Sequence, residues 1–303
     1  MLGRVTAIYG PRIVIQCDDR QVEAIASGKL KYGSKGSSLV AVGDYVEFSE
    51  GSVKTAFIDK IMERKTAISR PAVEREGMLQ VIVANIDRLV IVSSVVSPDL
   101  KPGLIDRFLV IAFKEKLHPV IVINKIDLAE PSEYKEHIET WREIGCDLIC
   151  TSAKSGLGIE ELGSFLNDGT SVIAGHSGVG KSSLLNRLNP ELHIKTSDIS
   201  KYSGKGVHTT SRVNMFRLFE DGWVADTPGL KDLGLADVTK KNLHRYFPEF
   251  ANFEDGCQFS NCVHVDEPSC GVKQALEENK IAEFRYQNYL NIYKDLKKDL
   301  IVY

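Results

Sequence analysis

The 303-residue chain has no apolar run long enough to cross a bilayer, and its first residues lack the apolar core of a signal peptide. Its six cysteines are too widely spread for a disulfide framework. Its net charge of −3 gives no overall basic character, so any contact with nucleic acid has to be local. These absences argue against a membrane-spanning protein and a small secreted scaffold. We expect a cytoplasmic protein of two or more domains.

What the chain does contain is a phosphate-loop motif, VIAGHSGVGKSS, at residues 172–183. Its glycines let backbone N–H groups turn towards phosphates, and the helix expected at about 181–187 adds its N-terminal dipole. We expect Lys181 to reach the β- and γ-phosphates as a catalytic group and Ser182 to bind Mg²⁺. A glycine-rich turn before an ordinary helix would match this pattern only rarely. The predicted GTP-binding residues here are Gly175, His176, Ser177, Gly178, Val179, Gly180, Lys181, Ser182 and Ser183.

A second nucleotide motif, N-K-I-D at residues 124–127, follows an apolar run typical of a buried strand. Ligands of parallel sheets bind at the carboxyl ends of strands. A carboxylate there accepts two hydrogen bonds from guanine, whereas adenine leaves it unpaired, so Asp127 predicts GTP rather than ATP. We expect Asn124 to brace the loop and contact the base, and the Lys125 stem to lie along the base plane. The segment 151–154 should touch the guanine O6, with predicted binding residues Ser152, Ala153 and Lys154. In isolation, N-K-x-D is equally compatible with a polar turn.

The polar segment 196–212, which follows the phosphate-loop helix, has the composition of a mobile switch loop. A threonine near its end can complete the Mg²⁺ shell, and we prefer Thr210, although the sequence does not separate it from Thr209. Further on, Asp226 is expected to hold Mg²⁺ through water, and the Gly229 amide to meet the γ-phosphate.

Leucine stands at position 230, where Ras-like enzymes have the glutamine that orients the attacking water. We therefore expect slow intrinsic hydrolysis with help from another group. His208, beside the switch threonines, is the best candidate within the chain, and an exposed loop histidine without a role is the equally simple alternative.

The order of these motifs is unusual, because N-K-x-D and the 151–154 segment precede the phosphate loop. The elements can still meet in space if the domain is circularly permuted. Apolar and amphipathic segments alternate at 88–95, 104–117, 119–124, 132–145, 147–154, 159–167 and 171–174. This alternation predicts a parallel sheet with helices on both faces, that is, an α/β phosphate-loop GTPase domain at 81–236.

The N-terminal residues 1–70 contain about five short β-rich segments and predict an OB-fold-like barrel. Eleven basic and eight acidic side chains give this part a charge of +3, which suggests an RNA-facing module but also suits an ordinary solvated surface. Residues 71–80 are typical of a linker.

The C-terminal part, 237–303, is predicted to be a mainly helical zinc-binding domain. Three thiols and one imidazole within fourteen residues fit a closed, structural zinc site; the alternative is a disulfide plus one thiol. The predicted ligands are Cys257, Cys262, His264 and Cys270. The tail at about 272–300 reads as helical, and its aromatic residues either pack on the zinc module or face RNA: Phe284, Tyr286, Tyr289 and Tyr293. Three other cysteines read as core residues: Cys17, Cys146 and Cys150.

The combination of barrel, permuted motifs and cysteine cluster resembles the ribosome small-subunit-dependent GTPase family, known as RsgA, YjeQ or YloQ. The likeness covers essentially the full length and includes GDYVEF (43–48), NKID, TSAK, GHSGVGKS, HTTS, DTPGL and the zinc ligands. It implies a bacterial-type factor that binds the small ribosomal subunit late in maturation, with weak GTPase activity stimulated by that subunit. It also implies a catalytic role for His208, since the family has a hydrophobic residue where Leu230 stands. The modest basicity of the barrel is a mild departure.

We therefore predict a monomeric GTP hydrolase whose partners are GTP, GDP, and the small ribosomal subunit with its rRNA, with no membrane. Its cofactors are one structural Zn²⁺ and the Mg²⁺ that accompanies GTP. Two alternatives stay open. One is a guanine-nucleotide-sensing RNA- or protein-binding module with incidental hydrolysis, which Leu230 favours slightly. The other is a permuted GTPase whose partner is a protein rather than RNA.

Overall fold

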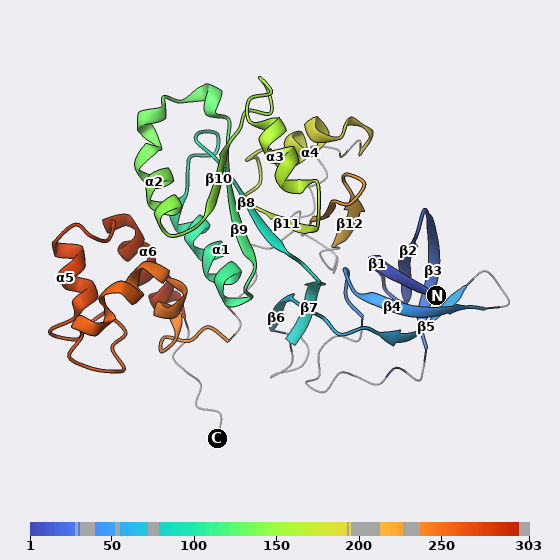
Figure 1. Cartoon of the computed structure of the whole chain (residues 1–303), viewed down its shortest axis with the longest axis horizontal. Coiled ribbons are helices and arrows are strands. Elements are labelled where there is room, and N and C mark those ends of the chain that lie inside the picture. The colour runs from blue at the N-terminus through green and yellow to red at the C-terminus, as the bar shows by residue number, and fades with distance from the viewer. Residues whose placement is uncertain are drawn as a thin grey trace, which may run out of the picture.

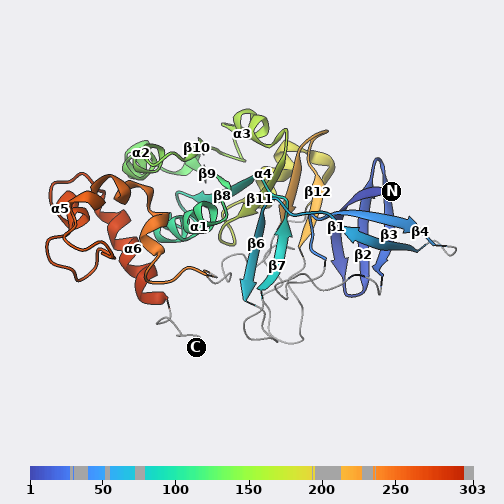
Figure 2. The same ribbon diagram turned by 60° about the horizontal axis from the view of Figure 1, so that its bottom comes forward.

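The computed structural model describes residues 1–27, 30, 40–51, 55–71, 79–192, 194, 213–226, 235 and 237–296. These residues form three parts in a row (Figures 1 and 2). A central α/β part lies between an N-terminal barrel and a C-terminal helical module. In the described part of the chain, no helix is both long and apolar enough to span a membrane.

The N-terminal barrel has the strand order β1-β2-β3-β5-β4 and closes through pairing of β1 with β4. Alternating side chains on these strands fill its interior, where Val5, Ile15 and Ile58 are completely buried. The parallel β3–β5 pair and the closure confirm the predicted OB-like barrel. The strands are β1 (Leu2–Tyr9), β2 (Arg12–Cys17), β3 (Arg20–Ala26), β4 (Tyr45–Glu50) and β5 (Ala56–Ile61).

The predicted linker at 71–80 differs from the structure at both of its ends. Strands β6 (Ala67–Pro71) and β7 (Leu79–Ala84) pair antiparallel, while residues 72–78 lie outside the described part. The physical reason is burial, because the alternating segment that begins at Leu79 places Val81 and Val83 in apolar surroundings. The barrel and the α/β part are therefore joined by a paired ribbon.

The central sheet has five parallel strands in the order β10-β9-β8-β11-β13, with β12 antiparallel at its edge. Successive side chains of each strand point to opposite faces, so Ile91 packs on one face and Val92 on the other. Helices α1 (Pro102–Lys114) and α2 (Lys135–Glu143) cover the first face, and α3 (Ile159–Leu166) and α4 (Lys181–Leu188) the second. The strands are β8 (Arg88–Ser94), β9 (His118–Asn124), β10 (Asp147–Cys150), β11 (Thr170–Ala174), β12 (Asn214–Arg217) and β13 (Trp223–Asp226).

This arrangement confirms the predicted α/β fold, with element ends shifted by up to four residues: the strand predicted at 147–154 ends at Cys150. Short 3₁₀ turns fill several of the connections: η1 (Ile126–Leu128), η2 (Pro131–Glu133) and η3 (Pro190–Leu192).

The barrel is fixed to the central sheet through β1. Strand β1 pairs with β12, so eleven of the described strands form one continuous sheet. The buried Arg4 guanidinium donates to the Asn85 carbonyl at 3.0 Å and to Thr170 Oγ1 at 2.7 Å. It also lies over the rings of Tyr45 and Trp223, at 5.0 and 5.3 Å from their centroids. One barrel residue thus contacts the strand that leads into the phosphate loop.

Among its described residues, the C-terminal module has two α-helices where the sequence predicts one helical tail. Helix α5 (Gly271–Glu277) ends before Asn279, which has a left-handed φ of 57°, and α6 (Glu283–Asp295) follows. Two 3₁₀ segments precede them, η6 (Leu243–Tyr246) and η7 (Pro248–Gly256). Residues 297–303 lie outside the described part. Helix α6 packs on α1, and the module shares its apolar core with that face of the central sheet.

Candidate nucleotide and metal sites

The phosphate loop occupies residues 175–180, between β11 and α4. Gly175, Gly178 and Gly180 have φ values of +147°, +85° and +100°, which side-chain-bearing residues rarely adopt. A Cβ on Gly175 would lie 2.1 Å from the Val92 carbonyl oxygen, and one on Gly180 would lie 2.3 Å from the Asn124 amide nitrogen. At these two positions the loop needs glycine both for its conformation and for the close approach of its neighbours.

Lys181, the first residue of α4, folds back across the loop that precedes it. Its ammonium donates hydrogen bonds of 2.9 Å to the carbonyls of Gly175 and His176. Lys181 and Ser182 are both buried, whereas Ser183 is exposed. The lysine charge therefore lies inside the curve of the loop, where the sequence places the phosphates.

Asn124 connects the three nucleotide motifs although they are far apart in the chain. Its Nδ2 donates to the Val179 carbonyl in the phosphate loop at 2.8 Å. Its Oδ1 accepts from Thr151 Oγ1 and from the Ala153 backbone N–H, both at 3.2 Å. The residue is 1% exposed, so the amide uses its hydrogen-bonding groups inside the protein.

Lys125 makes a second connection to the phosphate loop. Its ammonium donates to the Gly178 carbonyl at 2.8 Å and also contacts the Ser97 carbonyl. The sequence predicts only a packing role for the Lys125 stem, and its charged end anchors two loops in addition. No local sequence pattern predicts this contact, because Gly178 lies 53 residues further along the chain.

The segments 124–127 and 151–154 lie side by side at the carboxyl ends of β9 and β10. The Thr151 carbonyl accepts from the Ile126 N–H at 3.2 Å, and the Thr151 N–H donates to the Ile123 carbonyl at 2.8 Å. The Asp127 side chain is exposed, and Ser152 is buried with its Oγ accepting from the Ser155 N–H at 3.1 Å. The carboxylate of Asp127 is therefore accessible beside two loops that are hydrogen-bonded to each other.

Asp226 ends β13, the parallel neighbour of β11, and it pairs in register with Ile173 just before the phosphate loop. Burial raises the pKa of Asp226, and the nearby Lys181 charge partly offsets this effect. The structure thus places a carboxylate next to the loop lysine. The other predicted switch residues lie outside the described residues: His208, Thr209, Thr210, Gly229 and Leu230.

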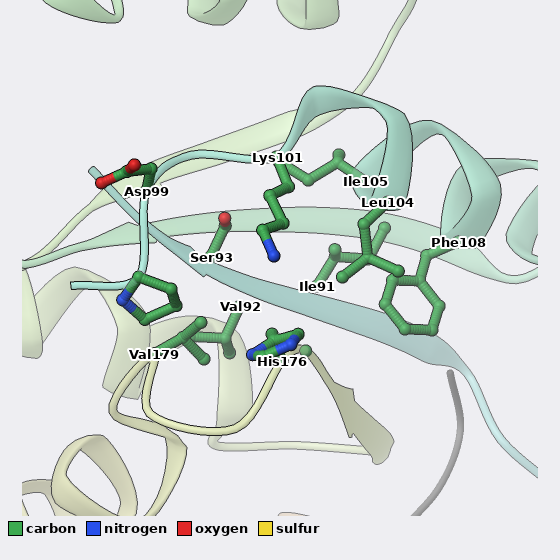
Figure 3. A pocket seen from close by; sticks show the side chains of 12 residues that line it. Ile91, Val92, Ser93, Asp99, Lys101, Leu104, Ile105, Phe108, His176 and Val179 are labelled. Carbon is green, nitrogen blue, oxygen red and sulfur yellow. The ribbon is translucent and has the colours of Figure 1, made fainter. Parts of the chain in front are cut away.

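A pocket adjoins the phosphate loop on the side of α1 (Figure 3). Its walls come from the end of β8, the start of α1 and the loop itself, through His176 and Val179. Ile91, Leu104 and Phe108 line one side of it with apolar groups, and Asp99 and Lys101 lie on the segment above. The phosphate loop therefore borders a small, partly apolar hollow.

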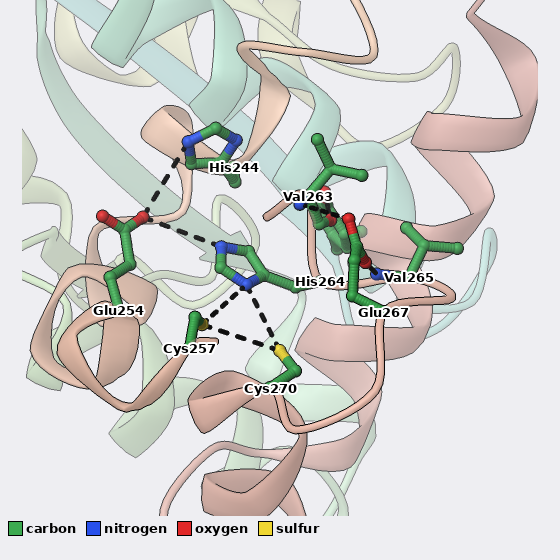
Figure 4. Close-up of polar contacts among 9 residues, drawn as sticks. His244, Glu254, Cys257, Val263, His264, Val265, Glu267 and Cys270 are labelled. Carbon is green, nitrogen blue, oxygen red and sulfur yellow. Dashed lines mark hydrogen bonds and ion pairs between the residues drawn. The ribbon is translucent and has the colours of Figure 1, made fainter. Parts of the chain in front are cut away.

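The four predicted zinc ligands lie together in the C-terminal module, and Figure 4 shows three of them, Cys257, His264 and Cys270. His264 Nδ1 lies 3.6 Å from Cys257 Sγ and 3.4 Å from Cys270 Sγ, and the two sulfurs are 3.9 Å apart. With Cys262, all four ligand atoms lie within 4.8 Å of one another. Zn–S bonds of about 2.3 Å and Zn–N bonds of about 2.0 Å in a tetrahedron place ligand atoms roughly 3.5–3.8 Å apart. The cluster can therefore hold one metal ion, and its donors fit zinc.

The loop that carries His264 is held in place from outside the cluster. Glu267 accepts hydrogen bonds from the N–H groups of Val263 and Val265, at 2.7 and 2.9 Å. Burial alone would raise the pKa of Glu267, but hydrogen bonds from backbone N–H groups outweigh it, so the net pKa is lowered. The Tyr286 hydroxyl donates to the His264 carbonyl at 2.7 Å, and Tyr289 contacts the carbonyl of Val263. These tyrosines pack on the module, as the first of the two alternatives for the tail predicts. Glu267 was not identified from the sequence, because a single glutamate after a histidine carries no signal.

The fold and the motif arrangement define a circularly permuted GTP-binding protein with a barrel before its GTPase domain. A family model described as RsgA GTPase matches residues 61–236. A curated relative from Chlorobaculum tepidum, named small ribosomal subunit biogenesis GTPase RsgA, is 41% identical, with 97% of each chain covered. A relative of the same name from Geobacillus sp. is 42% identical over 85% of each chain.

Solved structures agree with this class. The crystal structure of YjeQ from Thermotoga maritima superposes with a TM-score of 0.77 at 34% identity, covering 97% of this chain and 98% of the other. The structure of YloQ, described as a circularly permuted GTPase, has a TM-score of 0.71 at 28% identity, covering 97% and 94%. The chain therefore belongs to the RsgA GTPase family, and it is a GTPase.

Proposed function

We propose that this GTPase is a late assembly factor of the small ribosomal subunit, whose hydrolysis is stimulated by the subunit and leads to release of the factor. The observation that carries the nucleotide part is the Asn124 side chain, which joins the guanine-side loops to the phosphate loop. The ribosomal part is supported by the relatives named small ribosomal subunit biogenesis GTPase, which cover nearly the whole chain.

In the proposed GTP complex, Asp127 accepts the guanine N1–H and exocyclic amine, while 151–154 presents backbone amides to O6. The N–H groups of residues 175–183 surround the phosphates, and Lys181 exchanges its two carbonyl contacts for phosphate oxygens. Ser182, Thr210 and Asp226 are the proposed residues for Mg²⁺, directly or through water. When bound, Mg²⁺ neutralises charge on the β- and γ-phosphates.

Hydrolysis by the chain alone is expected to be slow. Leu230 has no polar group with which to orient water, so another residue has to do so. We propose His208 for that role, with Thr209 or Thr210 and the Gly229 amide sensing the γ-phosphate. The subunit would act by placing these residues around GTP.

The barrel and the metal-binding module are the proposed contacts to rRNA. They lie at opposite ends of the molecule, with the GTPase part between them (Figure 2). The barrel exposes part of the aromatic rings of Tyr9 and Phe57, which offer faces for base stacking, and residues 1–70 carry a charge of +3. The four-ligand cluster leaves no open metal position, so its role in this proposal is structural.

GTP turnover with and without purified small subunits tests the proposal. We expect a low rate alone, an increase of about tenfold or more with small subunits, no response to large subunits, and no turnover of ATP. The variant His208→Ala should bind GTP normally and lose the stimulated rate. An unchanged rate with small subunits would contradict the proposal.

A second function is favoured by Leu230, namely a guanine-nucleotide-sensing module in which hydrolysis is incidental. The two are separated by measuring release from subunits with GTP and with a non-hydrolysable analogue. Release that requires hydrolysis supports the enzyme, and equal release with both supports the sensing module. Salt dependence addresses the partner, because binding through rRNA phosphates weakens steeply with salt whereas a protein contact does not.

A further inference from the structure

The His264 ring separates two groups of side chains in the C-terminal module (Figure 4). Its Nδ1 faces the sulfurs of Cys257 and Cys270, and its Nε2 faces Glu254, whose Oε1 is 3.7 Å away. The histidine is 1% exposed, and within the described chain its Nε2 has no hydrogen-bond partner at normal distance. One ring nitrogen thus points at the metal cluster and the other at a carboxylate.

An imidazole that binds a metal through one nitrogen carries its proton on the other. In this ring Nδ1 faces the cluster, so the N–H is at Nε2, inside the protein. A buried N–H requires an acceptor, and the Glu254 carboxylate lies in its direction. A shift of less than 1 Å brings the two atoms to a normal hydrogen-bond distance of about 2.9 Å.

We propose that Glu254 is a positioning residue of the zinc site: it accepts the His264 Nε2–H and so fixes Nδ1 as the metal ligand. This inference rests on the proposed binding of zinc by the cluster. Since the carboxylate is charged, it also raises the basicity of the ring and strengthens its bond to the metal.

The His244 ring also lies near this carboxylate. Its Nε2 is 3.9 Å from the same Glu254 oxygen, and its ring lies edge-on to the His264 ring with centroids 5.3 Å apart. Glu254 is on η7 and His244 on η6, so the carboxylate lies between two histidines of different segments. Positioning of His264 therefore depends on packing within the module as well as on the ligand loop.

His244, Glu254 and His264 also have the spacing of a metal-binding group, because their ligand atoms lie within 4.8 Å of one another. A second ion there would require Nε2 of His264 to lose its proton while Nδ1 binds zinc. That charge state is much less favourable than an N–H donating to a carboxylate. The geometry therefore favours the hydrogen bond, and a second ion becomes an outcome of the test.

The experiment measures zinc content and zinc affinity of the full chain by competition with a chromophoric chelator. It compares the native chain with Glu254→Ala, Glu254→Gln and a control, Asp255→Asn, which changes an exposed carboxylate one residue away. We expect one zinc per chain in all four. Affinity should fall about 10–100-fold in Glu254→Ala, less in Glu254→Gln, and stay native in the control.

Two spectroscopic readouts separate positioning from general destabilisation. The Co²⁺-substituted native chain and Glu254→Gln should both show tetrahedral spectra, because the four ligands are unchanged. In nitrogen-15 NMR, His264 should be metal-bound at Nδ1 and protonated at Nε2, and its Nε2–H should exchange faster with solvent in both Glu254 variants.

Affinity of both Glu254 variants within twofold of native would overturn the inference, while the zinc proposal would stand. Two zinc ions in the native chain and one in Glu254→Ala would also overturn it, by making Glu254 a ligand. A native chain that binds no zinc would refute the zinc proposal itself. If Glu254→Ala fails to fold, Glu254→Gln and the NMR signal still decide the question.

Discussion

Asn124 Nδ2 donates a 2.8 Å hydrogen bond to the Val179 carbonyl, across 55 residues of sequence. In the same side chain, Oδ1 accepts from the loop after β10. Permutation of the chain changes the order of these loops along the sequence without separating them in space. A single buried amide therefore holds the guanine-side loops and the phosphate loop in one arrangement.

Replacement of Asn124 by alanine should weaken GTP binding by about 10–100-fold. The change leaves the Val179 carbonyl and two donors without partners inside the protein, and each lost bond costs about 1 kcal/mol. Asn124→Asp keeps the acceptor but turns an oxygen towards the Val179 carbonyl, so it should bind GTP as poorly. Titration calorimetry measures both. The control is Asn242→Ala, which removes two local side-chain hydrogen bonds in the C-terminal module and should leave GTP affinity unchanged. Native GTP affinity of Asn124→Asp would contradict the role of the Asn124–Val179 hydrogen bond.

Arg285 on α6 forms a buried ion pair with Asp106 on α1, with N and O atoms 2.5 Å apart, and a second pair with Glu249 at 2.7 Å. Arg285→Met should lower the free energy of unfolding by about 3–5 kcal/mol, because it leaves two carboxylates without their counter-charge. Urea denaturation measures this change. Adding Asp106→Asn should recover part of the loss, since the amide oxygen still accepts from Trp141.

The control for Arg285→Met is Arg107→Met on α1, the helix that carries Asp106. Arg107 contacts the exposed Asp295 at 3.4 Å, and such surface pairs contribute less than about 1 kcal/mol. Equal effects of the two arginine changes would show that the buried pair does not hold the module on the GTPase part.

Zinc uptake by the C-terminal cluster should release about three protons near pH 7. Burial raises the pKa of Cys262 to about 12 and also raises that of Cys270, so these thiols are protonated before the metal binds as thiolates. Burial lowers the pKa of His264, so the imidazole is neutral and contributes no proton. Affinity therefore rises with pH, by up to about three orders of magnitude per unit.

Calorimetry of zinc binding in buffers of different ionisation enthalpy counts these protons. Cys262→Ser should reduce the number by one. Cys146→Ser, a buried cysteine outside the cluster whose pKa is raised to about 12, should leave it unchanged. Release of one proton or none by the native chain would contradict the three-thiolate site.

The features that the sequence predicted well are those that depend on short patterns. The glycines and Lys181 lie in a phosphate loop of the expected shape, and alternation of apolar side chains places the parallel strands. The order of the motifs predicted the permutation, because a circularly permuted domain still brings 124–127 and 151–154 to the same edge of the sheet as the phosphate loop.

Contacts between distant segments were not predictable in the same way. Asp106 and Arg285 lie on helices that carry other charged residues, and nothing in the sequence near either one indicates a buried partner. Residue 71 is a proline beside charged residues, so a linker was the natural interpretation, yet it ends a paired strand. Similarly, the contact of Arg4 with Thr170 depends on the closure of the barrel against the central sheet, which no local pattern encodes.

The central claim, that Asp127 and its neighbours form a guanine site, is tested most directly by nucleotide binding to Asp127→Asn. Xanthine has an oxygen where guanine has the exocyclic amine, so an amide at 127 can accept from N1–H and donate to that oxygen. We predict that GTP affinity falls by about 100-fold or more while xanthosine triphosphate gains affinity. Glu160→Gln, an exposed carboxylate on α3, should change neither. Unchanged GTP binding by Asp127→Asn, or no gain for xanthosine triphosphate, would contradict the account.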